Sequence, residues 1–164
     1  MYKLDEIDQK IVDCLMEDGR MQAAEIARRL GNVSERVVRY RVEQLIEKKV
    51  VVVSAIVNPK VLGLSVVADV WLEVESDSIL EVAHKMAAFD NVSYVACSIG
   101  DDDISMQVLG HDATEVYQFV TQVVGKVAGV RKTSTSIVPL VIKDVFQWRI
   151  PDQALAKDLT SQSS

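Results

Sequence analysis

The sequence contains few of the residues from which metal sites, disulfide frameworks and catalytic centres are built. It has two cysteines, Cys14 and Cys97, and two histidines, His84 and His111, which stand in different parts of the chain. Neither pair has the spacing of a zinc site, a disulfide framework or a histidine-based triad. Paired carboxylates and a nucleophile beside a base are also missing. We therefore expect a protein that is not an enzyme and that carries no cofactor and no metal.

Aromatic residues and long apolar runs are scarce as well. Aromatics make up 5% of the chain, so valine, isoleucine, leucine and alanine must build the core. No apolar run approaches the roughly 18 residues that cross a bilayer. The opening residues, MYKLDEIDQK, lack the apolar segment of a secretory signal. With 49% hydrophobic and 26% charged residues, the composition is that of a globular protein, and we expect a cytoplasmic location with reduced thiols.

Positive charge is scarce except on one short stretch. The chain has a formal net charge of −6, and residues 61–164 carry 7 basic and 14 acidic side chains. Residues 28–49, by contrast, hold seven basic and three acidic side chains. The N-terminal part of the molecule is therefore expected to be positive on one face, while the rest is acidic.

Residues 1–50 have the hydrophobic spacing of three short helices, within residues 4–20, 23–31 and 32–49. Gly31 ends the second helix, and Ser34 is a candidate N-cap of the third. A helix, a short turn that contains glycine and a second helix are the parts of a helix-turn-helix.

The pattern changes after Val50. The β-branched run 51–57 favours an extended segment, and the alternation in residues 65–75 predicts a strand with one face on a core. The remaining elements are expected in this order: a helix in 78–89, strands in 92–99 and 104–110, a helix in 113–127 and a strand in 130–144.

We therefore predict an α+β protein in which an N-terminal three-helix unit of the winged-helix-type helix-turn-helix class precedes a ferredoxin-like βαββαβ sandwich. The sandwich has four antiparallel strands with two helices on one face. The expected boundaries are a helix-turn-helix domain over 1–50, a hinge strand or linker over 51–62, the sandwich over 63–145, and a C-terminal tail over 146–164, whose last part, ALAKDLTSQSS, is polar and expected to be mobile.

The third helix has a basic outer side. Val38, Val42 and Leu45 form its apolar stripe, and Arg36, Arg39 and Tyr40 lie opposite. A recognition helix inserts its N-terminal half into the major groove, which gives Arg36 and Arg39 access to guanine edges or phosphates. The alternative is a solvated helix with intrahelical pairs such as Arg39–Glu43. Arg41, at the edge of the stripe, is expected to pair with an acidic residue of the first helix.

Several segments together resemble the Lrp/AsnC (feast/famine) family of transcriptional regulators. In chain order they are LDEIDQKIVDCLMEDGR, AAEIARRLGNVSERVVRYRVEQLIEKKVV, VNPKVLG, SIGDDDISMQV and GVRKTSTSIV. The resemblance runs from Leu4 to Lys143. It implies a sequence-specific DNA-binding regulator that forms homodimers, often assembles into octamers, and responds to a small effector such as an amino acid. Where the family usually has a glycine at the end of the recognition helix, this chain has Lys49.

Site residues follow from the helix and from the resemblance. The residues expected at DNA are Ser34, Glu35, Arg36, Arg39, Tyr40, Arg28 and Arg29. The resemblance places an effector near the residues Tyr94, Ser98, Gly100, Asp101, Asp102, Asp103, Thr133 and Thr135. It also implies dimerisation through the sheet face that carries Val67 and Trp71.

Other interpretations stay open at this stage. The three aspartates form a solvated turn or a cation clamp as readily as an effector site. Thr133 and Thr135, expected to alternate with the inward residues of their strand, are ordinary on an exposed face. The whole protein is alternatively a ligand-binding oligomer with little DNA affinity, or an enzyme such as the tetrapyrrole decarboxylases related to this family.

Overall fold

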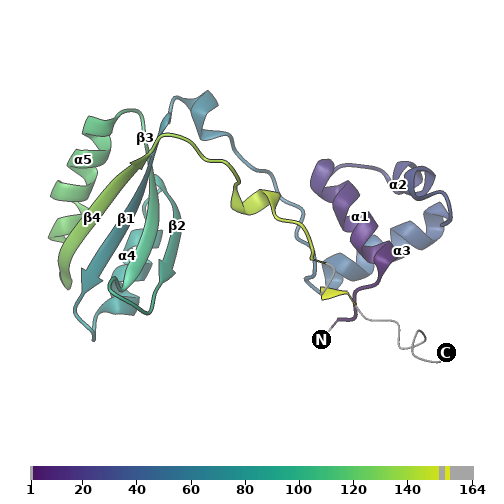
Figure 1. Ribbon diagram of the computed structural model, residues 1–164, viewed down its shortest axis with the longest axis horizontal. Coiled ribbons are helices and arrows are strands. Elements are labelled where there is room, and N and C mark those ends of the chain that lie inside the picture. Colours follow the sequence, from purple (N-terminus) through teal and green to yellow (C-terminus); the bar gives the residue numbers. More distant parts are fainter. Residues whose placement is uncertain (1, 152–153, 156–164) are drawn as a thin grey trace. The chain divides into compact units, whose positions relative to one another are not determined.

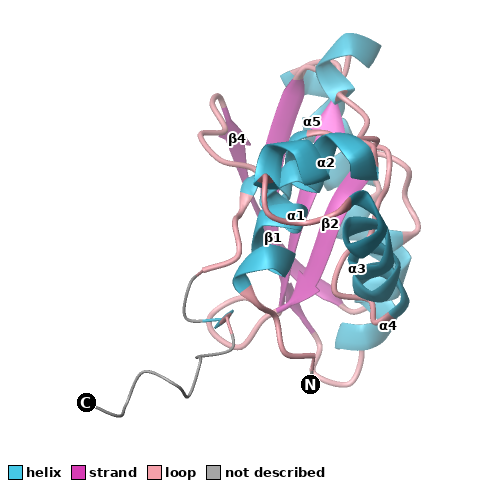
Figure 2. Ribbon diagram, turned by 90° about the vertical axis from the view of Figure 1, so that its right-hand side faces the viewer, coloured by secondary structure: helices cyan, strands magenta, loops and turns pink. Residues whose placement is uncertain are grey.

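The computed structural model describes residues 2–151 and 154–155, and the chain divides into two compact units (Figure 1). The first, called here the helical unit, comprises the residues up to Ile56 together with the segment from Lys143 onward. The second, the sheet unit, comprises Val57–Ile142. All strands of the described residues belong to the sheet unit (magenta in Figure 2).

Three helices form the helical unit: α1 (Glu6–Glu17), α2 (Ala23–Leu30) and α3 (Glu35–Glu47). The side chain of Asp5 caps α1 by accepting a hydrogen bond from the Asp8 N–H at 2.8 Å. Gly31 ends α2 in the left-handed backbone region, with φ of 76°. The helices enclose a small apolar core, whose fully buried members are Ile11, Val12, Ile26, Val38 and Leu45. The sequence therefore predicted this unit correctly.

A lysine follows α3 in a conformation that usually requires glycine. Lys49 has φ of 56°, in the left-handed region. The N–H of Lys49 donates to the carbonyl of Ile46 at 2.9 Å, and the N–H of Val50 donates to that of Leu45 at 2.8 Å. These two bonds form a Schellman motif. The helix thus ends where a glycine would end it and does not run on.

The sheet unit has the predicted βαββαβ order. Its elements are β1 (Val66–Val74), α4 (Ile79–Ala87), β2 (Val92–Cys97), β3 (Ile104–Gly110), α5 (Ala113–Gln122) and β4 (Val130–Val138). The strands pair in the antiparallel order β2-β3-β1-β4. Short 3₁₀ turns lie at Pro59–Leu62, Val124–Lys126 and Val145–Gln147. The α+β class and the ferredoxin-like sheet are confirmed.

Alternation along the strands separates two faces of the sheet. On β1, the residues Ala68, Val70 and Leu72 are fully buried against the two helices. The other face, called here the open sheet face, has no helix of the described residues packed on it. Its members include Val67, Asp69, Trp71, Tyr94, Ser105, Gln107 and Ser134.

Residues 51–58 belong to no strand of the described sheet, so within this chain they have the form of a linker, which is one of the two forms expected from the sequence. A strand requires a hydrogen-bonded neighbour, and the sheet begins only at Val66. Within the expected C-terminal tail, Ile150 packs against the apolar core of the helical unit. The rest of the expected tail, residues 152–153 and 156–164, lies outside the described residues.

Candidate nucleic-acid interface

The exposed side of α3 is the surface that the sequence predicts to be cationic. Val38 and Leu45 point into the core, and residues such as Arg36 and Tyr40 lie on the opposite side at helical spacing. Tyr40 is 62% exposed. Among the described residues Arg36 forms no ion pair, so its guanidinium is available for an external partner. The sequence prediction for the outer side of α3 agrees with this geometry.

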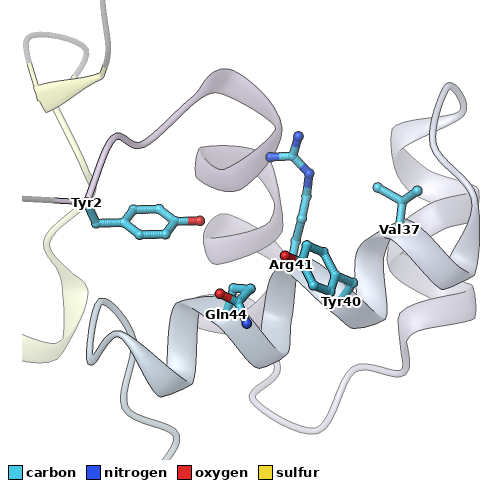
Figure 3. Close-up of a pocket in the computed structure, with 5 residues that line it drawn as sticks. All are labelled: Tyr2, Val37, Tyr40, Arg41 and Gln44. Atoms are coloured by element: carbon cyan, nitrogen blue, oxygen red, sulfur yellow. The ribbon is translucent and has the colours of Figure 1, made fainter.

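A shallow hollow of about 390 Å³ adjoins this side of the helix, lined by Tyr2, Val37, Tyr40, Arg41 and Gln44 (Figure 3). Only Tyr40 was among the predicted site residues; the other four were not, and Arg41 was expected to have a structural role. Val37, Tyr40 and Gln44 recur at intervals of three and four, so a helical wheel centred on Tyr40 would have identified the other two. Tyr2 has no such signal, because it lies before α1 in the sequence.

Arg39 is held by an intrahelical ion pair. Its guanidinium Nη2 contacts the carboxylate of Glu35 one turn earlier. The alternative of a solvated helix named the pair Arg39–Glu43; the structure instead has the intrahelical pair Arg39–Glu35. Arg39 therefore lies on the flank of the helix that Glu35 occupies, and Arg36 is the less constrained of the two arginines.

The start of α3 is capped by its own sequence. The Ser34 hydroxyl oxygen accepts from the backbone N–H of Val37 at 3.4 Å, as expected of an N-cap residue. Ser34 and Glu35 are both exposed. The hydroxyl proton of Ser34 remains able to donate to an outside acceptor, whereas the Glu35 carboxylate adds negative charge at this helix end.

The two arginines of α2 hold carboxylates inside the helical unit. Glu25 accepts hydrogen bonds from Arg28 at 2.7 Å and from Arg29 at 3.0 Å, and these bonds lower the pKa of Glu25 to about 2. Arg29 also donates to Glu17 of α1 at 2.6 Å. The structure thus gives Arg29 a role in joining α1 to α2, while the Arg28 side chain remains largely exposed.

Arg41 attaches α3 to α1. Its Nη1 donates to Asp5 and to Asp8, each at 2.7 Å, and the Asp8 side chain is almost fully buried. The Tyr2 hydroxyl also donates to Asp8, at 3.2 Å. Burial lowers the pKa of Arg41, but the two hydrogen-bonded carboxylates outweigh this effect and the net direction is upward. The expectation that Arg41 pairs with the first helix is confirmed.

The predicted effector residues of the sheet unit do not meet at one point. Thr133 and Thr135 pair with Leu72 and Val70 and therefore point to the helix-covered face, contrary to the outward direction expected from sequence. There they line a hollow of about 380 Å³ with Tyr117 of α5. Tyr94 pairs with Gln107 and lies on the open sheet face. Strand register, which the sequence did not reveal, decides both placements.

The loop between β2 and β3 contains the remaining effector candidates. Asp103 has a structural role, because its carboxylate accepts from the N–H of Val74 at 2.7 Å and its own N–H donates to the carbonyl of Leu72 at 2.9 Å. Ser98, Gly100 and Asp101 are exposed. Asp102 is half-buried. The pKa of Lys132 is raised mainly by its hydrogen bond to Glu73, and the negative charge of Asp102 raises it further. Within the described residues, no cluster of histidines, cysteines and carboxylates is arranged to hold a metal ion.

Val67 and Trp71 both lie on the open sheet face and are half-buried. A hydrogen bond from Gln107 to Asp69, at 3.2 Å, runs between these rows. The face therefore combines apolar side chains with a hydrogen-bonded polar pair, a composition common at protein–protein interfaces. None of the described helices is long and apolar enough to span a membrane.

Comparison with known proteins gives matches to both units. Residues 4–46 match the family model described as the AsnC-type helix-turn-helix domain, and residues 67–147 match that of the Lrp/AsnC ligand binding domain. An uncharacterized HTH-type transcriptional regulator of Pyrococcus furiosus is 38% identical over 141 residues, which cover 85% of this chain and 95% of that protein. The HTH-type transcriptional regulator LrpA of Pyrococcus horikoshii is 34% identical over 136 residues, with coverage of 82% and 96%.

Solved structures share the fold. AsnC of E. coli superimposes with a TM-score of 0.79 at 23% identity, over 88% of this chain and 99% of that chain. A transcriptional regulator of Neisseria meningitidis, solved as a complex with L-Met, superimposes with a TM-score of 0.80 at 24% identity, over 87% and 94%. Both the order of the two units and the topology of the sheet are therefore shared with these proteins.

Proposed function

Because the chain belongs to the Lrp/AsnC family of transcriptional regulators, we propose that it binds double-stranded DNA as a homodimer, with one α3 helix in the major groove at each half-site. The observation that supports this most directly is the outer side of α3. It is capped, exposed and cationic at its N-terminal half, and Arg36 is unpaired among the described residues.

The residues have distinct roles in this proposal. Arg36 reads a base edge or a phosphate, Tyr40 packs on the sugar-phosphate backbone, and Ser34 with the helix N-terminus holds a phosphate. Arg39 reaches DNA after it exchanges Glu35 for a phosphate oxygen. Arg28 contacts a phosphate from α2, and Arg29 holds α2 in place against α1 through its bond to Glu17.

Duplication of the helical unit compensates for its modest charge. Residues 1–56, the N-terminal part of this unit, carry 10 basic and 10 acidic side chains, so a single unit provides little electrostatic attraction. In a dimer, binding of one unit gives the second a high effective concentration at the neighbouring half-site. The acidic sheet unit is repelled by DNA, which leaves α3 to dock.

We propose further that a small molecule, such as an amino acid, binds the sheet unit and changes DNA occupancy through different affinities in two states. Two separate places are candidates: Thr133 and Thr135 supply hydroxyl groups in the hollow beneath α5, or Asp101 and Asp102 supply acceptors at the β2–β3 loop. The L-Met bound by the Neisseria regulator makes amino acids the first class to test.

The decisive experiment is selection of bound genomic DNA fragments, followed by affinity measurements at rising salt. The double variant Arg36→Ala and Arg39→Ala should lose about 10²-fold or more in affinity and flatten the salt dependence. Arg131→Ala, which removes an exposed arginine from the sheet unit, is the matched control. Absence of binding by the unmodified chain at low salt would instead favour a ligand-binding oligomer without DNA affinity.

Titration calorimetry with a panel of amino acids tests the effector. Thr133→Val and Thr135→Val remove the two hydroxyls while they keep the branched shape, and Asp101→Asn with Asp102→Asn neutralises the loop. Ser134→Ala lies on the opposite face of β4 and serves as the control. Whichever pair weakens binding locates the ligand, and no heat with any amino acid contradicts this part of the proposal.

A further inference from the structure

The C-terminal segment returns to the helical unit after the sheet is complete. Ile150 packs against the apolar core formed by the three helices. The Gln9 side chain of α1 donates to the Ile150 carbonyl at 3.1 Å. Arg149 reaches Asp13, also on α1, with 3.5 Å between Nη1 and a carboxylate oxygen. Residues 148–151, called here the clasp, therefore hold one helix by an apolar, a hydrogen-bonded and an ionic contact.

The clasp lies at or beyond the end of the region matched by the family. The ligand-binding-domain match ends at residue 147, and the Pyrococcus furiosus relative is covered to 95% by only 85% of this chain. The contacts of Arg149 and Ile150 are thus made by residues outside that match. The short run Trp-Arg-Ile-Pro has no hydrophobic periodicity, so the sequence alone indicates no role for these residues.

The two segments that connect the units leave the sheet at one place. β1 begins at Val66 and β4 ends at Val138, and Val67 is paired directly with Val138. The first segment, 51–65, leads back to Val50 and Val51, which pack on the helical core. The second, 139–147, leads to the clasp. The helical unit is thus attached to neighbouring strand ends at both α3 and α1.

We propose that the clasp is an intramolecular docking element that gives the helical unit a second tether to the sheet unit, and thereby restricts the separation of two helical units on DNA. One tether allows a domain to rotate about its linker, whereas two tethers that start together and end on different helices resist such rotation. The part that concerns DNA rests on the proposed function. The attachment of the clasp to α1 does not.

Truncation provides the first test. A chain that ends at Gln147 lacks the clasp, and a chain that ends at Leu155 keeps it. Hydrogen exchange in α1 should become about tenfold faster in the shorter chain and stay unchanged in the longer one, because local opening no longer breaks the contacts of Ile150. The amides of β1 report on the sheet unit and should not respond to either truncation.

Point variants separate the clasp from the loss of chain length. Ile150→Asp places a charge against the apolar core and should reproduce the faster exchange of α1. Phe146→Ala is the matched control, since Phe146 is an exposed apolar residue of the same segment outside that core. Unchanged exchange in α1 after truncation at Gln147, or equal effects of the two point variants, would overturn the clasp.

DNA duplexes with one or two copies of the selected half-site test the second tether. Loss of the clasp should leave affinity for one half-site within about twofold and weaken binding to two half-sites about tenfold. Tolerance of altered half-site spacing should increase. An unchanged preference for spacing overturns the tether even if α1 exchanges faster. Failure of the unmodified chain to bind either duplex counts against the proposed function alone, because hydrogen exchange in α1 tests the clasp in the absence of DNA.

Discussion

Arg41 of α3 donates to the buried carboxylate of Asp8 on α1 at 2.7 Å, and so joins the proposed recognition helix to the rest of the helical unit. Beside the shared apolar core, this bond from an arginine side chain that is three-quarters buried fixes the position of α3 relative to α1. Loss of Arg41 would leave the buried Asp8 carboxylate without a cation, whereas loss of Asp8 would leave Arg41 paired with Asp5 alone.

Replacement of Arg41 by alanine should destabilise the helical unit by about 3 kcal/mol, because the Asp8 carboxylate would stay buried without its cation. Hydrogen exchange of α1 and α3 in a denaturant series measures this change. Arg20→Ala, which removes an exposed arginine with only a 3.8 Å ion pair, should cost less than about 0.5 kcal/mol. Similar costs for the two variants would show that Arg41 carries no special role.

We propose that the homodimer forms through the open sheet face. Substitution of Trp71 by lysine should then raise the dimer dissociation constant about 100-fold, because an aromatic anchor is exchanged for a charge that the partner must desolvate. Sedimentation at a series of protein concentrations measures the change. Leu80→Lys introduces the same charge at an exposed position of α4 and should leave association unaffected. Dimers that persist unchanged with Lys at position 71 would exclude this face.

Glycine at position 49 should stabilise the helical unit by about 1 kcal/mol, because glycine adopts the left-handed conformation of this residue without steric cost. The same substitution at Lys48, which has an ordinary φ of −79°, should destabilise by a comparable amount. Thermal unfolding of the two variants in parallel gives the comparison. Opposite signs are expected, and a loss of stability in both would contradict the account of the helix end.

Acid should weaken the helical unit partly through Glu25, whose pKa of about 2 lies below its ordinary value of 4.5. A carboxyl with a depressed pKa stabilises the fold fully above its unfolded pKa and loses that contribution as the pH falls from 4.5 toward 2. Glu25→Gln lacks the contribution at every pH. The difference in unfolding midpoint between the variant and the unmodified chain should therefore shrink across this window, as urea titrations at several pH values would reveal.

Local patterns in the sequence were sufficient for the elements and for several of their contacts. The apolar spacing of Val38, Val42 and Leu45 oriented α3, and the place of Arg41 at the edge of that stripe indicated its bond to α1. Each of these features depends on residues within one helix, where spacing determines direction.

Features that depend on pairing between distant segments were not predictable in this way. The sides on which Thr133 and Thr135 point follow from the register of β4 against β1, and a shift of one residue would reverse them. Glu35 and Glu43 are each four residues from Arg39, so spacing alone does not choose between them. The return of Ile150 to α1 spans 141 residues and involves a single apolar side chain, which leaves no periodic signal.

Asp103 joins the β2–β3 loop to the C-terminal end of β1. Its backbone N–H and its carboxylate form hydrogen bonds with Leu72 and Val74, which are successive buried residues of that strand. A ligand that displaced Asp101 or Asp102 would have to break these two hydrogen bonds before the loop could move independently of the sheet. A displacement of the loop would therefore be transmitted to β1, one of the two central strands.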